Sequence, residues 1–163
     1  MERLWSPWRY AYVAATGGER PDPGICVFCD AQEDPADDER KFVLHRGQRG
    51  FVLLNLYPYV SGHMMIAPYA HLGDFAAAPK EVTDELMDLA KRAQAALGET
   101  YHPEGFNLGM NLGRVAGAGV PDHIHLHVMP RWIGDTSFMT TIADTRVLPE
   151  DLQTTYIKLR EKF

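Results

Sequence analysis

The chain has 163 residues, enough for one domain with its own hydrophobic core, and we predict a single domain over residues 1–163. Hydrophobic residues make up 45% of the sequence and charged residues 23%, as in ordinary globular proteins. The net charge of −6 argues against a broad basic surface, and no apolar run reaches the length of a membrane span, so we expect no nucleic-acid or membrane partner. The first residues contain no signal-peptide core, and we therefore expect a cytoplasmic protein.

Residues 1–24 are predicted to form an aromatic segment followed by a loop rich in glycine and proline. The next feature is a C-x-x-C pair made by Cys26 and Cys29, the only cysteines in the chain, which we interpret as a tight knuckle. In a reducing compartment this spacing indicates metal or redox chemistry rather than a structural disulfide. An acidic stretch over residues 31–40 is expected to be a solvated loop.

The remaining elements follow from hydrophobic periodicity and turn residues. Apolar residues recur at steps of three and four from Pro79 to Leu97, which predicts the main helix, and Gly98 is expected to end it. A closing helix is expected over residues 149–163. Strands are predicted at 41–45, 51–56, 63–67 and 107–113, the second and third forming a hairpin. The fold class is therefore α+β, a small antiparallel sheet with one major helix and a C-terminal helix.

The most informative stretch contains three histidines, His123, His125 and His127, that alternate with apolar residues. Strict alternation is the strand period, so the histidines should share one face while the other face enters the core. Three imidazoles on one face are unusual for stability alone, because imidazole changes charge near neutral pH and serves as a nucleophile or metal ligand. The alternation therefore predicts a functional site on this strand.

This pattern resembles the signature of the histidine-triad superfamily of nucleotide hydrolases and transferases. Residues 54–68 resemble the asparagine strand and the Gly-His strand of its fragile-histidine-triad branch. Residues 3–9 and 130–138 resemble bacterial members related to diadenosine tetraphosphate phosphorylase. The resemblance covers most of the chain, and it implies the histidine-triad fold, commonly a two-fold dimer, so we expect a homodimer.

The resemblance also implies roles for individual residues. His125 would form a covalent nucleotidyl-histidine that water or inorganic phosphate then breaks, and His127 would hydrogen-bond the phosphate. Asn55 would hold the ribose hydroxyls and Asn111 would contact the phosphate or its surroundings, although either amide could instead serve a strand end. The predicted catalytic group consists of His63, His123, His125 and His127.

The loop before the first histidine is rich in glycine, and its backbone N–H groups around Gly119 and Val120 are predicted to cradle phosphate oxygens. The hydrolase branch has a glutamine four residues before the first triad histidine, where this chain has Gly119. Glycine has no side chain that could place a water molecule. This departure favours a phosphorylase-like enzyme, with the acceptor left open between phosphate and water.

A structural zinc site takes four cysteine or histidine ligands. Some bacterial triad proteins and their galactose-1-phosphate uridylyltransferase relatives use ligands that match Cys26, Cys29, His71 and His123. We therefore expect a structural zinc and no organic cofactor. The alternative is a pair of free thiols with a surface His71, and His45 is a less favoured substitute ligand.

The leading interpretation is an enzyme that acts on dinucleoside polyphosphates, such as diadenosine tetraphosphate, or on related adenosine phosphates. A second interpretation is a regulatory module that binds nucleotides with little turnover, although such a module would not need the nucleophile His125. A redox protein is disfavoured because the C-x-x-C follows a loop rather than ending a strand.

Overall fold

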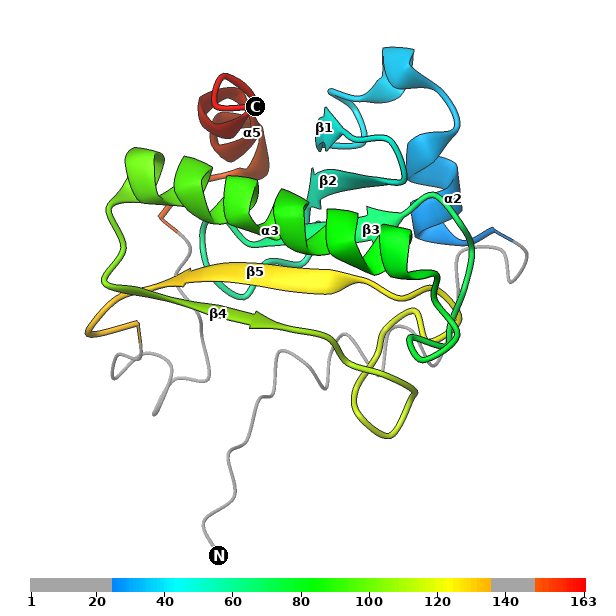
Figure 1. Cartoon of the computed structure of the whole chain (residues 1–163). Coiled ribbons are helices and arrows are strands. Elements are labelled where there is room, and N and C mark those ends of the chain that lie inside the picture. The colour runs from blue at the N-terminus through cyan, green and yellow to red at the C-terminus, as the bar shows by residue number, and fades with distance from the viewer. Residues whose placement is uncertain (1–24, 136–148) are drawn as a thin grey trace, which may run out of the picture.

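The structure is a computed structural model that describes residues 25–135 and 149–163; the aromatic segment predicted for residues 1–24 lies outside them. Its centre is a five-stranded antiparallel sheet in the order β1-β2-β3-β5-β4 (Figure 1). The strands are β1 (Val43–Arg46), β2 (Gly50–Leu54), β3 (Met64–Pro68), β4 (Gly105–Gly109) and β5 (Leu126–Arg131). The predicted α+β class is confirmed, as is the hairpin of β2 and β3.

Two helices cover one face of the sheet. Helix α3 (Lys80–Tyr101) crosses β2, β3 and β5, while α5 (Leu152–Arg160) lies beside α3 and against β1 (Figure 1). The main core fills the space between them, and the apolar residues of the histidine stretch belong to it: Ile124, Leu126 and Val128. The alternating apolar residues therefore enter the core, as predicted, although hydrogen-bonded strand pairing begins only at Leu126.

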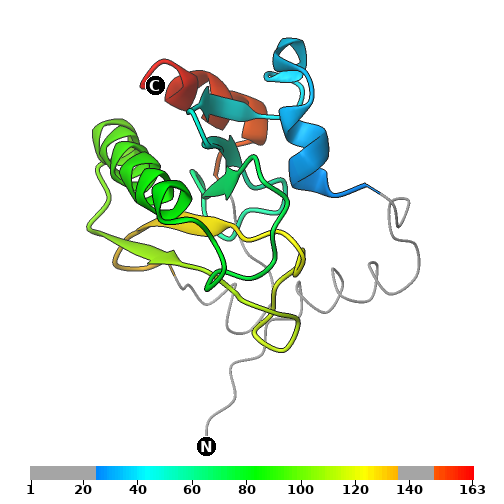
Figure 2. The same ribbon diagram turned by 45° about the vertical axis from the view of Figure 1, so that its right-hand side comes forward.

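The opposite face carries a smaller core built around α2 (Val27–Gln32), which Figure 2 shows beside the strands. The predicted knuckle is instead the start of this short helix, with Cys26 at its N-cap, because Phe28 and Ala31 pack against the sheet and hold the turn. The predicted loop over residues 31–40 contains a 3-10 turn, η1 (Pro35–Asp37). Asp34 starts that turn by accepting a hydrogen bond from the Ala36 N–H.

Helix α3 does not stop at Gly98 as predicted but runs one turn further, to Tyr101. The Tyr101 side chain packs against the main core and donates a hydrogen bond to Glu150, which stabilises the added turn. His102 then takes a left-handed conformation, with a φ of 46°, and its N–H bonds to the Gly98 carbonyl. The helix ends where Pro103 follows.

Strand β4 lies at an edge of the sheet and spans fewer residues than the predicted 107–113. Of the apolar residues that alternate along this stretch, Met110 packs against the core, whereas Leu108 and Leu112 are 43% and 46% exposed. These two leucines are exposed because β4 lies at the edge of the sheet, whereas α3 covers β2, β3 and β5. Among the described residues, no helix is long and apolar enough to cross a membrane.

Candidate active site and metal site

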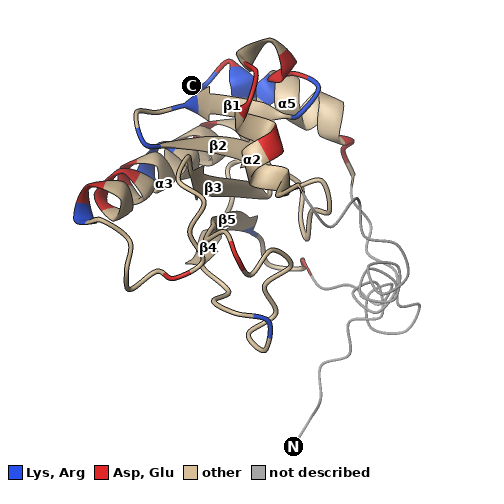
Figure 3. Cartoon of the chain, turned by 90° about the vertical axis from the view of Figure 1, so that its right-hand side faces the viewer, with Lys and Arg blue, Asp and Glu red and all other residues tan. Residues whose placement is uncertain are grey.

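Four histidines gather where β5 begins and where the chain enters β3. His63, His123, His125 and His127 are all buried, with side chains between 0% and 9% exposed. A buried imidazole must find hydrogen-bond partners, and these partners determine which ring nitrogen carries the proton. Strands β2 and β3 contain no Asp, Glu, Lys or Arg, as Figure 3 shows.

His125 has one ring nitrogen bound to a carbonyl. Its Nδ1 lies 2.9 Å from the backbone oxygen of His123, and a carbonyl only accepts, so Nδ1 carries the proton. The unprotonated lone pair is then on Nε2. Burial lowers the pKa of His125, which favours the neutral ring. A neutral imidazole with its lone pair on Nε2 is the form that can attack phosphorus.

The protonated nitrogen of His127 is set by two consecutive hydrogen bonds, from Tyr59 to His63 and from His63 to His127, which we call the relay. The Tyr59 N–H donates to His63 Nδ1 over 3.2 Å, which places the His63 proton on Nε2. His63 Nε2 lies 2.9 Å from His127 Nδ1 and donates to it, so His127 carries its own proton on Nε2. The relay thus prepares His127 as a donor for an anion, whereas His125 is prepared as a nucleophile.

His123 is predicted for both the catalytic group and the metal site, and its ring is oriented toward the metal site. Its Nε2 donates to the Pro68 carbonyl over 2.9 Å, so Nδ1 has the lone pair. That nitrogen lies 3.3 Å from the sulfur of Cys26 and 3.7 Å from the sulfur of Cys29. The contribution of His123 to the nucleophile is its backbone oxygen.

The four predicted metal ligands form one cluster. The candidate ligand atoms of Cys26, Cys29, His71 and His123 all lie within 4.8 Å of one another, and His71 Nδ1 is 3.3 Å from the Cys29 sulfur. A tetrahedral zinc with its usual bond lengths separates sulfur and nitrogen ligands by about 3.6 Å, so the cluster fits that ion. The His123–Pro68 hydrogen bond is the outer contact that commonly fixes a ligating imidazole.

The charge state of the two cysteines depends on whether a metal is bound. Burial and the neighbouring Cys26 raise the pKa of the Cys29 thiol, which disfavours two adjacent thiolates without a metal. The substitute ligand His45 lies elsewhere: its ring stacks on Phe163 and its Nε2 accepts a hydrogen bond from Arg92 over 2.7 Å. The less favoured alternative, His45 as a substitute ligand, is therefore not part of this cluster.

The predicted nucleotide-binding residues are distributed over three segments. Asn55 is joined to the relay, since its Nδ2 lies 3.3 Å from His63 Nδ1 and its Oδ1 accepts the Tyr57 N–H over 2.9 Å. Asn111 follows β4 and is half-buried. Gly119 is exposed and Val120 packs against the smaller core, both in the loop leading to His123. Their contacts with a ligand stay predictions.

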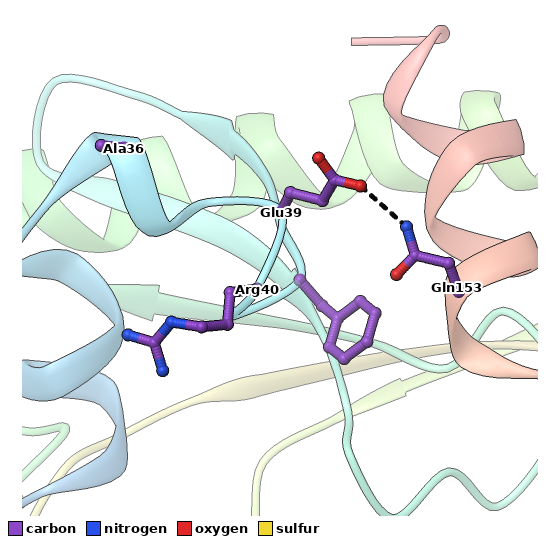
Figure 4. A pocket seen from close by; sticks show the side chains of 5 residues that line it. Ala36, Glu39, Arg40 and Gln153 are labelled. Atoms are coloured by element: carbon purple, nitrogen blue, oxygen red, sulfur yellow. Dashed lines mark hydrogen bonds between the residues drawn. The ribbon is translucent and has the colours of Figure 1, made fainter.

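Sequence reasoning missed three contributors to the site. Two are backbone groups, the Tyr59 N–H and the Pro68 carbonyl, for which side-chain patterns carry no signal. The third is Phe28, whose ring contacts those of His123 and His125. Its position between the two cysteines was the available signal. A separate open hollow contains no histidine or cysteine; Figure 4 shows its lining of Ala36, Glu39, Arg40, Phe42 and Gln153.

The arrangement places a histidine with a free Nε2 lone pair and a histidine with a proton on Nε2 close together, beside a Cys2His2 cluster. A model of the HIT domain family matches residues 37–132, more than half of the chain. The AP-4-A phosphorylase of Mycobacterium tuberculosis is 36% identical over 157 residues, which cover 95% of this chain and 80% of that protein. The chain belongs to the HIT family, as the resemblance implied.

Solved structures agree with this assignment. A zinc-bound histidine-triad family protein from Mycobacterium smegmatis has a TM-score of 0.66 and 27% identity, covering 84% of this chain and 91% of its own. A hypothetical histidine-triad nucleotide-binding protein from Sulfolobus tokodaii shares the fold, with a TM-score of 0.65 at 23% identity and coverage of 84% of this chain and 91% of its own. The family and these relatives support the predicted class of enzyme, a nucleotidyl transferase or hydrolase, and are consistent with zinc in the cluster.

Proposed function

We propose that this protein is an enzyme that cleaves dinucleoside polyphosphates, such as diadenosine tetraphosphate, through a covalent nucleotidyl intermediate on His125. The observation that carries the proposal is which ring nitrogen is protonated in each histidine. His125 has its lone pair on Nε2, while the relay through His63 leaves His127 with its proton on Nε2. Similarity to an AP-4-A phosphorylase over 95% of the chain supports this substrate class.

In the first step, His125 Nε2 attacks the α-phosphorus, a P–N bond forms and the P–O bond to the leaving nucleotide breaks. The ring becomes cationic, and the carbonyl oxygen of His123 stabilises it through the Nδ1 proton. His127 donates to the phosphate oxygen on which negative charge grows. In the second step, an acceptor oxygen attacks the same phosphorus, and the electron pair of the P–N bond returns to Nε2.

Inorganic phosphate is the favoured acceptor. Gly119 offers no side chain to orient water, whereas phosphate is itself an oxygen nucleophile that backbone N–H groups of the loop can hold. Asn55 is assigned to the ribose hydroxyls, and Asn111 to the phosphate or its surroundings. With diadenosine tetraphosphate, phosphate as acceptor yields ADP and ATP, whereas water yields AMP and ATP.

The proposed metal site, homodimer and cytoplasmic location rest on separate observations. Cys26, Cys29, His71 and His123 would hold zinc, which when bound supplies a structural link between α2 and the residues before β5. A homodimer is supported by the outer edge of β4, which pairs with no strand in residues 25–135 and 149–163 and carries the exposed Leu108. A cytoplasmic location is supported by two thiols that are poised for metal rather than joined in a disulfide.

The test is analysis of the products from diadenosine tetraphosphate with and without inorganic phosphate. We expect ADP and ATP that form only when phosphate is present. The matched variant Gly119→Gln supplies the hydrolase side chain, and it should raise the share of AMP. AMP and ATP formed by the wild-type protein without phosphate would refute the phosphorylase assignment. Binding without turnover in either condition would support the regulatory module instead.

A further inference from the structure

Phe28 links the metal cluster to the nucleophile. Its ring centroid lies 5.1 Å from that of His123 and 4.7 Å from that of His125. Only 1% of Phe28 is exposed, so the ring is enclosed by these contacts and by the smaller core. The rings thus form a continuous row: His71, His123, Phe28, His125, His127, His63 and Tyr59.

The orientation of the His125 ring must be fixed for Nε2 to react. One hydrogen bond, from Nδ1 to the His123 oxygen, restrains the ring at a single atom. The χ2 torsion of histidine is broad and roughly two-fold, so a flipped ring would direct the wrong edge at the substrate. Phe28 lies tilted by 36° at 4.7 Å, and the His127 ring is 5.0 Å away. Together these neighbours restrict that rotation.

The position of Phe28 depends in turn on α2. Phe28 lies in the sequence between the predicted ligands Cys26, two residues before it, and Cys29, directly after it, and both sulfurs approach Nδ1 of His123. Helix α2 has six residues, too few for stability without tertiary contacts. A metal held by this cluster would therefore fix α2, and with it the ring of Phe28.

We propose that Phe28 is a positioning residue for His125, and that through it the metal cluster controls the orientation of the nucleophile. The inference rests on the proposed function for His125 as the reacting group. It extends that function by a regulatory consequence: loss of the metal would release α2 and reduce the rate of the covalent step without removing any group that touches the substrate.

The first experiment compares Phe28→Leu with the matched control Phe51→Leu. Phe51 belongs to the same smaller core and is fully buried, but its recorded ring partner is Tyr69. Both variants remove the same atoms from the same core. We expect Phe28→Leu to lower kcat by about 10- to 100-fold while KM changes less than about threefold, and Phe51→Leu to keep kcat near the wild-type value.

The second experiment needs no turnover. NMR spectra of the full chain with ring-labelled histidine are recorded with zinc and after chelation, and His125→Gln identifies the His125 signals. We expect narrow His125 signals with zinc, and broadened or doubled signals after chelation or in Phe28→Leu. Equal kcat values for the two leucine variants, with unchanged His125 signals, would overturn the inference. Failure of the proposed function is distinct, since the wild-type protein would then show no His125-dependent turnover.

Discussion

At the scale of single residues, the reactivity of the site is decided by hydrogen bonds to backbone atoms. The His123 carbonyl fixes the proton of His125 on Nδ1, and the Tyr59 N–H begins the relay that fixes the proton of His127 on Nε2. In the proposed mechanism, these proton positions give two chemically identical side chains opposite roles. Neither role depends on a carboxylate, which suits a site for an anionic substrate.

The first prediction concerns His125 itself. His125→Ala should lower kcat by a factor on the order of 10⁴ or more, because no other group replaces the nucleophile, while nucleotide affinity is largely retained. Steady-state kinetics and calorimetric binding measure the two effects. The control is His102→Asn, which changes an exposed histidine in the left-handed position after α3. Persistent turnover in His125→Ala would rule out the covalent mechanism.

The sequence predicted which residues share the site but not how their rings are used. A period of two places His123, His125 and His127 on one face, and the structure has them there. The sequence period does not determine a side-chain rotamer or a hydrogen bond to a distant carbonyl such as that of Pro68. For this reason the orientation of His123 toward the cysteines was known only from the resemblance.

At the scale of elements, α2 packs against the sheet, and Cys26 and Cys29 at its start belong to the proposed metal site. Cys26→Ser should reduce the bound zinc and lower the melting temperature by on the order of 10 °C, since a structural metal contributes directly to folding. Metal analysis and thermal unfolding provide the readouts. Val27→Ser, at an exposed position of the same helix, serves as the control. No zinc in the wild-type protein and an unchanged melting curve in Cys26→Ser would contradict the structural-zinc proposal.

The contact between α5 and β1 should respond to pH through His45. Burial lowers the pKa of His45 from its ordinary value of 6.5, and Arg92 and Arg160 lower it further against a weaker opposing effect of Glu85. The unfolded chain then binds this proton more readily than the folded chain. The His45 contribution to stability is therefore complete above pH 6.5 and is lost as the pH falls below that value.

Protonation would also break the hydrogen bond that His45 Nε2 accepts from Arg92. We expect the melting temperature of the wild-type protein to fall more between about pH 7 and pH 5 than that of His45→Gln, whose amide does not titrate. Thermal unfolding across this range measures the difference. Parallel pH profiles for the two proteins would show that His45 has no such effect.

The elements themselves were largely predictable, apart from their ends. Strong periodicity located α3, yet its last turn depends on Tyr101 packing against the core and bonding to Glu150, which lies far along the chain. Helix α2 was missed because six residues carry too little periodicity and are helical only through tertiary packing. Local sequence does not contain either piece of information.

At the scale of the whole molecule, the two faces of the sheet pack against different helices. Helices α3 and α5 cover one face, while α2 lies against the other (Figures 1 and 2). The rings of His123 and His125 contact Phe28 of α2, and His123 approaches the sulfurs of Cys26 and Cys29. The outer edge of β4 pairs with no other strand among the described residues, and β4 carries the exposed Leu108. An unprotected edge of this kind is suited to pairing with a second copy of the chain.

The proposed homodimer is therefore tested at β4. Leu108→Asp should shift the protein from dimer to monomer, because a buried charge at a paired edge is strongly unfavourable. Sedimentation equilibrium measures the change. Ile157→Asp makes the same change at an exposed apolar position on α5 and should leave the dimer intact. A wild-type monomer, or equal behaviour of both variants, would contradict a dimer through this edge.

The covalent nucleotidyl-His125 step is the central claim, and the stereochemistry at the attacked phosphorus tests it most directly. Each in-line displacement inverts the configuration of phosphorus. A diadenosine tetraphosphate analogue with one chiral α-phosphorothioate would be converted in the presence of inorganic phosphate, and the configuration of the product determined. Attack by His125 followed by attack of the acceptor predicts net retention. Net inversion would mean a single direct displacement and would contradict the intermediate.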